Sequence, residues 1–532
     1  MIDENINKKG EIILCKGIKL DKNYENVLSY SESDMVSLCD SNKIYRGSNY
    51  SFMETGKTLN VEIPYADAMY SNYIAFKNPR FGNKWIFGFV TNVELISPKV
   101  TAISWEMDVW STWYGSFNLG KAFIEREHVD DDTIGKHTIP EGLETGEYVI
   151  QGTDDISIFG DEASDYYVVL GVTKYPGTTA VEGDNTGGKI YAGVYSGLAY
   201  ITGEDYAGIS NIIKSYEDNG ASDSIVCMFL APKYLCPNIT WVTVAGWSYN
   251  VKYGRIGEEE DEWGASFQTI TKPTVLAENY NPVNKKLLSF PYRYINVDNN
   301  VGNCMNFHYE DFSDNNIIFD AIGCLTPSTS YKIAPHNYKG VTTNYLYSFT
   351  PTKLPVCNWQ TDVYTNWLTQ NSVNVGLGVA GSGISLIAGA LTGNPIGVAS
   401  GILGIANSLG QVYEHSLTPP ALKGNLNSGD VNFAGKIVNP IIYEMSIKKE
   451  YAVAIDSYFS RFGYKVNEVK QPNLNSRQQF NFIKVGGMDE LVHGNIPASD
   501  LEKINDICRK GVTIFHNYTN FGNYTISNPI VS

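Results

Sequence analysis

The sequence predicts a mainly β protein with a few short helices. Among its 532 residues are 36 Tyr, 9 Trp and 49 Gly. Aromatic side chains suit the pleated, half-buried surface of a sheet, and glycines suit the turns between strands. Alternation of apolar and polar residues recurs in several segments, whereas helical periodicity is limited to short stretches. The length is sufficient for about two to four domains.

The clearest strand prediction lies in residues 102–110, AISWEMDVW. Its apolar positions are Ile103, Trp105, Met107 and Val109, and its polar positions are Ser104, Glu106 and Asp108. This period of two predicts one buried and one solvated face. A strand is also expected in residues 83–96, with Gly88 as the candidate position of a bulge. Further strands are expected within residues 165–175, 223–231 and 286–297.

Two amphipathic helices are predicted near the C-terminus. In the first, Ile455, Phe459 and Phe462 share one face, and Gly463 is expected to end the helix. The second is expected to begin at Ser499, with Glu502 completing a capping box. Its apolar face consists of Leu501, Ile504, Ile507 and Cys508, and Gly511 follows its last turn before a strand in residues 512–515.

The charge and cysteine content narrow the classes of function. The formal net charge is −17, which disfavours ordinary DNA binding because that depends on Lys and Arg neutralising phosphates. DNA that merely passes an acidic wall is compatible with this charge. The eight cysteines contain no CxxC pair, so we expect reduced, mostly buried thiols rather than a disulfide scaffold. The polar start MIDENINKKG does not resemble a secretory signal, so assembly in the cytoplasm is expected.

No catalytic residue, cofactor site or metal site is predicted. Residues 183–190, GDNTGGKI, lack the hydroxyl residue that completes a phosphate-binding loop. Cys304 and His308 are four residues apart, but no second pair of zinc ligands accompanies them. The acidic runs 130–132 and 258–262 lack the alternation and fixed glycine of a calcium loop. The sequence therefore predicts a protein that is not an enzyme.

The most informative segment is an uncharged, glycine-rich tract. Residues 363–413, 51 residues in all, contain no Asp, Glu, Lys or Arg. Pro395 divides the apolar core into two arms, residues 373–392 and 396–412, each about 25–30 Å long if helical. That length is close to the thickness of a bilayer core. Small residues that would allow close packing recur at every fourth position: Gly381, Ser385, Gly389, Gly393, Gly397 and Gly401.

Three readings of this tract stay open from the residues alone. It could be a buried helical hairpin, a permanent membrane anchor, or a hairpin that reaches a membrane only under certain conditions. Ten glycines between Gly376 and Gly410 would disfavour an isolated helix in water by roughly 10 kcal/mol, so the tract needs partners. The residues expected to contact a membrane are Val375, Leu377, Val379, Ile384, Leu386, Ile387, Leu391, Pro395, Ile396, Val398, Ile402, Leu403, Ile405 and Leu409.

Several segments together resemble the tail-knob, or distal tail tube, proteins of small short-tailed phages of Gram-positive bacteria, the Picovirinae type. They include FGNKWIFGFVTNVEL (81–95), FIEREHV (123–129), FPYRYI (290–295), SRFGYKVNEVKQPNLNSRQQFNFI (460–483) and GVTIFHNYTNFGNYTI (511–526). These segments are spread along essentially the whole chain. The glycine-rich tract occupies the place where that family carries a long hydrophobic loop.

The resemblance implies a discontinuous, β-barrel tail-tube-like domain, an irregular β-rich knob insertion and a long glycine-rich hydrophobic loop. The tube domain is then expected in residues 1–130, 285–355 and 440–532, the knob insertion in 131–284 and the loop in 356–439. The assembled form would be a hexameric ring.

The resemblance also implies a function and partners. A homohexamer at the distal end of the virion tail, bound to other tail and collar proteins, would conduct double-stranded DNA without recognising its sequence. Its loops would plug the tube and, when released, penetrate the host cytoplasmic membrane. Two other classes stay open: a cell-wall-binding adhesin or hydrolase, and a soluble pore-forming protein. A pore-forming protein should assemble from monomers on membranes, whereas a tail knob is a ring in solution.

Overall fold

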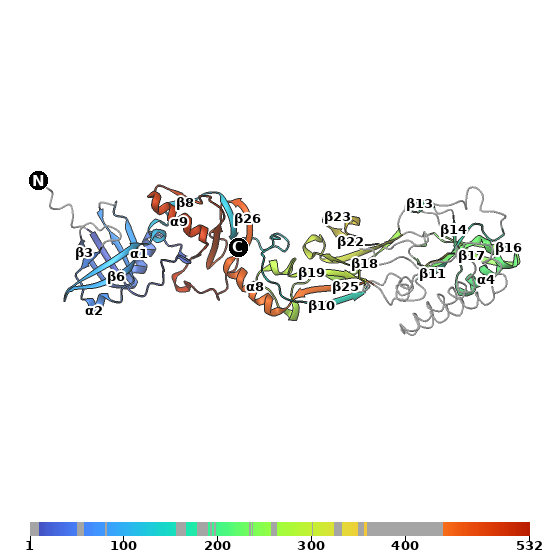
Figure 1. Cartoon of the computed structure of the whole chain (residues 1–532), viewed down its shortest axis with the longest axis horizontal. Helices are drawn as coiled ribbons and strands as arrows, with labels where there is room; N and C mark the ends of the chain where they lie inside the picture. The colour runs from blue at the N-terminus through green and yellow to red at the C-terminus, as the bar shows by residue number, and fades with distance from the viewer. Residues whose placement is uncertain are drawn as a thin grey trace. The chain divides into compact units, whose positions relative to one another are not determined.

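The computed structural model describes residues 10–50, 58–79, 82–155, 166–177, 190–191, 194–195, 198–233, 236, 238–256, 263–299, 302–323, 332–348, 356–358 and 440–531 (Figure 1). The contacts within the chain divide it into two units. Unit 1 comprises Met1–Gly146, Tyr280–Leu287 and Lys449–Ser532, and unit 2 comprises Glu147–Asn279 and Leu288–Lys448. Each unit is therefore built from separate pieces of the sequence.

Unit 1 contains a six-stranded sheet formed by its N-terminal piece. In spatial order its strands are β3 (Lys43–Tyr50), β1 (Gly10–Cys15), β5 (Tyr73–Lys77), β6 (Trp85–Ser97), β7 (Val100–Met107) and β4 (Leu59–Val61), and all neighbours are antiparallel. The helices of this region are α1 (Glu32–Ser41), α2 (Tyr65–Ala68) and α3 (Val109–Trp113). Ser31 begins α1 with a complete capping box to Asp34.

The second sheet of unit 1 combines strands from the N-terminal and the C-terminal pieces of the chain. Its order is β2 (Asn26–Leu28), β29 (Val512–Phe515), β27 (Phe480–Val485), β9 (Ala122–Glu127) and β26 (Tyr464–Lys470). A two-stranded sheet pairs β28 (Val492–Gly494) with β8 (Phe117–Leu119). The helices are α8 (Lys449–Phe462) and α9 (Ala498–Lys510), followed by the 3-10 turn η10 (Tyr518–Asn520).

Unit 1 contains the same strand–helix–strand arrangement twice. In the first copy, β1 precedes α1 and pairs antiparallel with β3, which follows the helix. In the second copy, β27 precedes α9 and pairs antiparallel with β29. The first strand of each copy also has a second antiparallel neighbour, β5 or β9. Unit 1 therefore uses one strand–helix–strand arrangement twice, once in its N-terminal piece and once in its C-terminal piece.

A shared core connects the two sheets of unit 1. One cluster of buried residues contains Ile13, Tyr73 and Phe87 from the first sheet together with Phe480 and Phe515 from the second. Such burial removes apolar surface from water and is worth roughly 25 cal/mol per Å². The N- and C-terminal pieces of the chain thus depend on one another for stability.

In the part of unit 2 that the structure describes, the strands form three larger sheets and one short hairpin. The first has the order β10 (Tyr148–Asp155), β25 (Ile441–Ile447), β19 (Arg293–Asp298) and β20 (Cys304–Phe307). The second has the order β16 (Thr240–Trp247), β17 (Tyr249–Arg255), β14 (Ala199–Thr202), β11 (Tyr166–Val172), β15 (Ile225–Pro232) and β24 (Val356–Asn358). The third has the order β18 (Trp263–Thr271), β21 (Asn316–Gly323), β22 (Lys332–Tyr338) and β23 (Val341–Thr343). The hairpin is β12 (Ile190–Tyr191) and β13 (Val194–Tyr195).

Helix α4 (Tyr206–Asp218) covers one face of the second sheet of unit 2. Asp205 begins the helix by accepting the backbone N–H of Gly208 at 2.7 Å. Ile209, Ile212 and Tyr216 of α4 pack in one core cluster with Val251 and Tyr253 of β17. Further 3-10 segments among the described residues are η4 (Ser222–Ser224), η6 (Ala277–Asn279), η7 (Lys285–Leu288), η8 (Tyr309–Asp311) and η9 (Tyr345–Tyr347).

The mainly β class and most predicted elements are confirmed, but three local predictions are wrong. Strand β7 ends at Met107, because the buried carboxylate of Asp108 accepts the N–H of Ser111 and begins α3 instead of facing solvent. Gly88 does not mark a bulge. It allows close approach, since a Cβ there would lie 2.3 Å from the ring of Trp105.

The third correction concerns the start of the last helix. Helix α9 begins at Ala498 after Pro497, and no side chain caps it, so the expected capping box between Ser499 and Glu502 does not form. Both predicted helix ends are confirmed. Gly463 and Gly511 follow α8 and α9 with φ of 64° and 93°, a region that glycine adopts without the usual steric cost.

A buried carboxylate joins the middle piece of unit 1 to α8. The side chain of Asp456, which is 3% exposed, accepts hydrogen bonds from the Tyr280 hydroxyl at 2.7 Å and the Val283 backbone N–H at 2.8 Å. It also accepts the backbone N–H of Asn284 at 2.9 Å and the Asn284 amide at 2.7 Å. One carboxyl group therefore satisfies four donors of the segment Tyr280–Leu287.

We expect the substitution Asp456→Ala to destabilise unit 1 by about 3–5 kcal/mol, because it leaves several buried donors without an acceptor. Limited proteolysis should then cut the chain near residues 280–287, and the melting temperature should fall. The control is Asp506→Ala on α9, which removes an exposed ion pair with Arg509 at 2.9 Å and should cost well under about 1 kcal/mol. Equal melting temperatures for the two variants would contradict this role of Asp456.

Candidate functional site

The residues predicted to act on a membrane lie outside the described residues. This holds for the fourteen predicted membrane-contacting residues between Val375 and Leu409 and for the six small residues between Gly381 and Gly401. Their roles stay predictions. Among the described residues, no helix has the length and apolar character needed to span a bilayer.

The two strands that bracket the tract are described. Before it, β24 pairs antiparallel with β15 at the edge of the six-stranded sheet of unit 2, with Cys357 opposite Met228. After it, β25 lies inside the four-stranded sheet and pairs antiparallel with both β10 and β19. In the sequence, the tract therefore follows an edge strand and precedes an interior strand.

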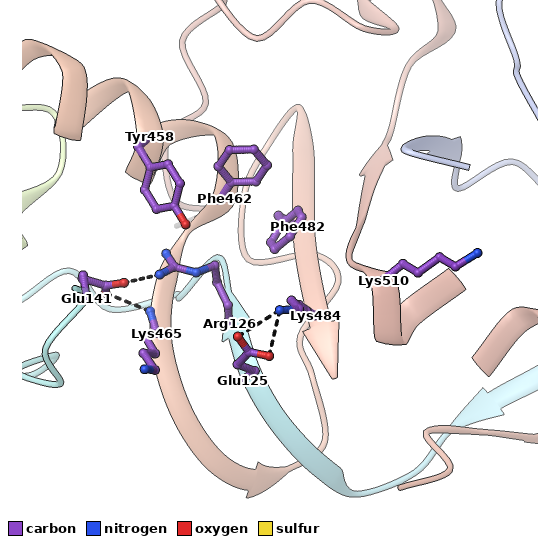
Figure 2. Close-up of a pocket in the computed structure, with 9 residues that line it drawn as sticks. All are labelled: Glu125, Arg126, Glu141, Tyr458, Phe462, Lys465, Phe482, Lys484 and Lys510. Carbon is purple, nitrogen blue, oxygen red and sulfur yellow. Dashed lines mark hydrogen bonds and ion pairs between the residues drawn. The ribbon is translucent and has the colours of Figure 1, made fainter. Parts of the chain in front are cut away.

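A pocket of about 340 Å³ lies in unit 1 between β9, α8, β26 and β27 (Figure 2). Tyr458 and Phe462 come from α8, and Phe482 comes from β27. The rings of Phe462 and Phe482 meet edge to face with centroids 5.2 Å apart. The charged residues that line the pocket are Glu125, Arg126, Glu141, Lys465, Lys484 and Lys510.

The charged groups of this pocket mostly use one another as partners. Lys484 and Glu125 form a half-exposed ion pair at 2.9 Å. Arg126 pairs with Glu141, donates to the carbonyl of Gly463 at 2.8 Å and lies 4.9 Å from the ring centroid of Tyr458. Figure 2 shows the ammonium groups of Lys465 and Lys510 directed away from the guanidinium group of Arg126.

Glu141 is the centre of a buried ionic cluster. Its side chain is 1% exposed, pairs with both Arg126 and Lys286, and accepts the backbone N–H of Lys465 at 3.0 Å. Burial, together with the neighbouring positive charges of Arg126 and Lys465, lowers the pKa of Lys286. Removing one member would leave the others buried without compensation. The cluster therefore binds residues 131–146 and the segment Tyr280–Leu287 to the second sheet.

A second carboxylate repeats this connection. Asp132 accepts the backbone N–H of Lys285 at 3.0 Å and the hydroxyl of Tyr464. Burial raises the pKa of Asp132, although both hydrogen bonds act in the opposite direction. The short segment Tyr280–Leu287 is consequently fixed by Asp132, Glu141 and Asp456, which come from two other pieces of the chain.

In the described part of the chain, no group of three or more His, Cys, Asp or Glu side chains is arranged to hold a metal ion. His308, considered above with Cys304, stacks on Phe290 with ring centroids 4.1 Å apart. Residues 183–189 of the incomplete phosphate-loop pattern lie outside the described residues.

The segment Tyr280–Leu287 and the carboxylates of Asp132, Glu141 and Asp456 together form a junction between the three pieces of unit 1. His128 lies beside this junction and is buried and uncharged. Its Nδ1 accepts the backbone N–H of Phe482 at 2.8 Å, and its Nε2 donates to the carbonyl of Ser460 at 3.1 Å. This pattern requires the neutral imidazole with its proton on Nε2. Burial, with a smaller contribution from the charge of Arg477, lowers the pKa of His128 to about 3.

Because the pKa of His128 is lower in the folded than in the unfolded chain, acid favours unfolding. The contribution of neutral His128 to the free energy of unfolding is constant above about pH 6.5 and is lost as the pH falls toward 3. Between pH 7.5 and 4.5 the loss amounts to about 2–3 kcal/mol. Hydrogen–deuterium exchange of β27 peptides should show this loss in the wild type. In His128→Asn, β27 should be less protected at pH 7.5, but its protection should change less with pH. Parallel pH profiles for the two proteins would contradict the assignment.

Sequence reasoning missed the carboxylates of the junction. Glu141 and Asp132 lie in a polar stretch that is typical of a domain boundary. Asp456 carried a usable signal, because it follows Ile455 on a short helix whose apolar face also contains Phe459. A charged residue on such a face is buried only if it is paired or hydrogen bonded.

Comparison with known proteins agrees with this architecture. Residues 250–529 match the model of the C-terminal domain of the Bacillus phage phi29 tail knob protein gp9, and residues 8–118 match that of the caudoviral major tail protein N-terminus. The tail knob protein gp9 of Bacillus phage phi29 is 26% identical over 563 residues, covering 92% of this chain and 93% of the relative. The corresponding protein of Bacillus phage PZA is 26% identical over 539 residues, covering 87% and 88%.

The fold is also that of a solved tail protein. The structure of the bacteriophage C1 tail knob protein gp12 matches with a TM-score of 0.63 at 14% identity, over 98% of this chain and 100% of that one. At this identity the match shows the fold alone. The phi29 gp9 model, however, spans more than half of the chain. The chain therefore belongs to the phage tail knob protein family of phi29 gp9 and is a structural component of a phage tail.

Proposed function

We propose that six copies of this chain form a ring at the distal end of the tail, through which double-stranded DNA leaves the virion. Other tail and collar proteins would hold the ring, which would be assembled in the host cytoplasm. The tube would be built from residues 1–130, 285–355 and 440–532, with the knob in 131–284 and the hydrophobic loop in 356–439. The protein would act without catalysis or a cofactor.

We further propose that the hydrophobic loops plug the tube and, after release, enter the host cytoplasmic membrane. The observation that carries this proposal is the absence of charge over 51 residues in a chain of the tail knob family. Its glycine content opposes a self-sufficient helix in water, which favours a segment that obtains its partners from other copies or from lipid.

Charge and topology also support the proposal. A net charge of −17 suits a conduit that DNA passes without being held. Strands β24 and β25 bracket the tract within the same unit, so an inserted segment can be long without separating the strands on either side. Loop length itself adds little entropic cost.

The ring predicts that purified protein is already six-fold in buffer. Electron-microscopy class averages should show closed rings in the absence of lipid. A soluble pore-forming protein would instead be monomeric until liposomes are added. Monomers in buffer that assemble only on membranes would therefore favour the pore-forming alternative.

The membrane role predicts that charges in the tract abolish liposome leakage. We expect the double substitution of Leu386 and Ile387 by Asp to lower the leakage rate at least tenfold, because each charge at a bilayer centre costs about 2.5–3.5 kcal/mol. Met488→Asp is the control, since this side chain is apolar and 93% exposed outside the tract. Unchanged leakage in the double variant would contradict the membrane role but not the ring.

A further inference from the structure

The hairpin of β16 and β17 presents two chemically different faces. Val242 and Val244 of β16 lie opposite Tyr253 and Val251 of β17, and all four pack in or against the core that contains α4. Alternation of side chains therefore places Trp241 on the opposite face. Figure 1 shows α4 close to the strands of this sheet, and β16 is the edge strand.

Trp241 is held as a flat platform rather than as part of the core. Its cross-strand partner is Gly254, and a Cβ at that position would lie 3.1 Å from Cζ3 of the indole and 2.8 Å from Ile239. The missing side chain lets the indole lie across the strand. Trp241 nevertheless stays 38% exposed, which is unusual for a residue type that is mostly buried. Within the described residues its indole N–H has no hydrogen-bond partner.

An ion pair lies beside this platform on the same face. Lys252 is two residues before Gly254 on β17, and its ammonium lies 5.5 Å from the centroid of the indole. The same ammonium pairs with the carboxylate of Glu204, and the two side chains are 48% and 55% exposed. The pair offers both hydrogen-bond donors and an acceptor to a ligand without adding net charge.

A pyranose ring fits this combination of groups. One face of such a sugar carries mainly C–H groups and can stack on an indole, while its equatorial hydroxyls extend sideways and can both donate and accept hydrogen bonds. The indole N–H, Lys252 and Glu204 would meet those hydroxyls. The net charge of −17 disfavours a base of a nucleic acid as the stacking partner, since the chain would repel the phosphates of that nucleic acid.

We propose that Trp241, Lys252 and Glu204 form a binding site for a neutral hexopyranose unit of a polysaccharide. None of these residues belongs to the uncharged tract, and the site would add carbohydrate recognition to unit 2. A single stacking platform binds weakly, and Gly254 acts as a positioning residue that keeps the indole flat.

Saturation-transfer NMR on the full-length protein tests the proposal, because it detects weak binding by a large protein. The probes are cellohexaose, maltohexaose and chitohexaose. At least one should receive saturation, most strongly at the C–H protons of one ring face. Trp241→Ala should reduce the signal at least tenfold, Trp241→Phe should retain part of it, and Lys252→Gln should weaken binding several-fold.

The control is Tyr70→Ala, which removes a 67% exposed aromatic side chain from unit 1 and should leave the signal unchanged. The proposal is overturned if none of the three sugars receives saturation, or if Trp241→Ala binds as the wild type does. A surface that instead contacts another protein would give the first of these results. Trp241→Ala should not alter rings or liposome leakage, so failure of this site and failure of the conduit are distinguishable.

Discussion

The fold depends on holding together pieces of chain that are far apart in sequence. Unit 1 is made of residues 1–146, 280–287 and 449–532, and the middle piece is too short to have a core of its own. It is fixed instead by three carboxylates: Asp132 and Asp456 accept its backbone N–H groups, and Glu141 pairs with Lys286. Several donors converge on each carboxylate, and these contacts compensate for the water that it loses.

This arrangement explains why the pocket of unit 1 is rich in charged side chains. Glu141 pairs with both Arg126 and Lys286 and accepts the backbone N–H of Lys465, so segments from all three pieces meet at this carboxylate. His128 adds an uncharged hydrogen-bonded link between β27 and α8. Polar groups in a low-dielectric region specify a unique arrangement when all are hydrogen bonded, because any other pairing leaves a buried polar group without a partner, which raises the free energy. The junction thereby holds together the ends of the three pieces of unit 1 between which residues 147–279 and 288–448 of unit 2 are inserted.

Local patterns predicted elements well and their partners poorly. The period of two identified β7, and glycines identified the ends of α8 and α9, because these signals depend on neighbouring residues. The prediction of a solvent-facing Asp108 was wrong because a short carboxylate side chain can cap a helix as readily as it can face solvent. Strand β9 pairs with β26 and β27, more than 300 residues away, and no local signal carries such information. The repeated strand–helix–strand module was hidden for the same reason. Composition alone singled out the uncharged tract, but the carboxylates of the junction became recognisable only once their distant donors were in place.

The two strands that bracket the tract differ in how firmly they are held. Strand β24 has three residues, lies at an edge and, among the described strands, pairs with β15 alone. Strand β25 has seven residues and pairs on both sides, with β10 and β19, in a sheet that also contains the buried ion pair of Arg293 and Glu444 at 2.8 Å. Local opening follows the number of hydrogen bonds and buried contacts that must be broken. Opening of the edge strand β24 therefore requires fewer broken contacts than opening of the interior strand β25, and it leaves the four-stranded sheet intact.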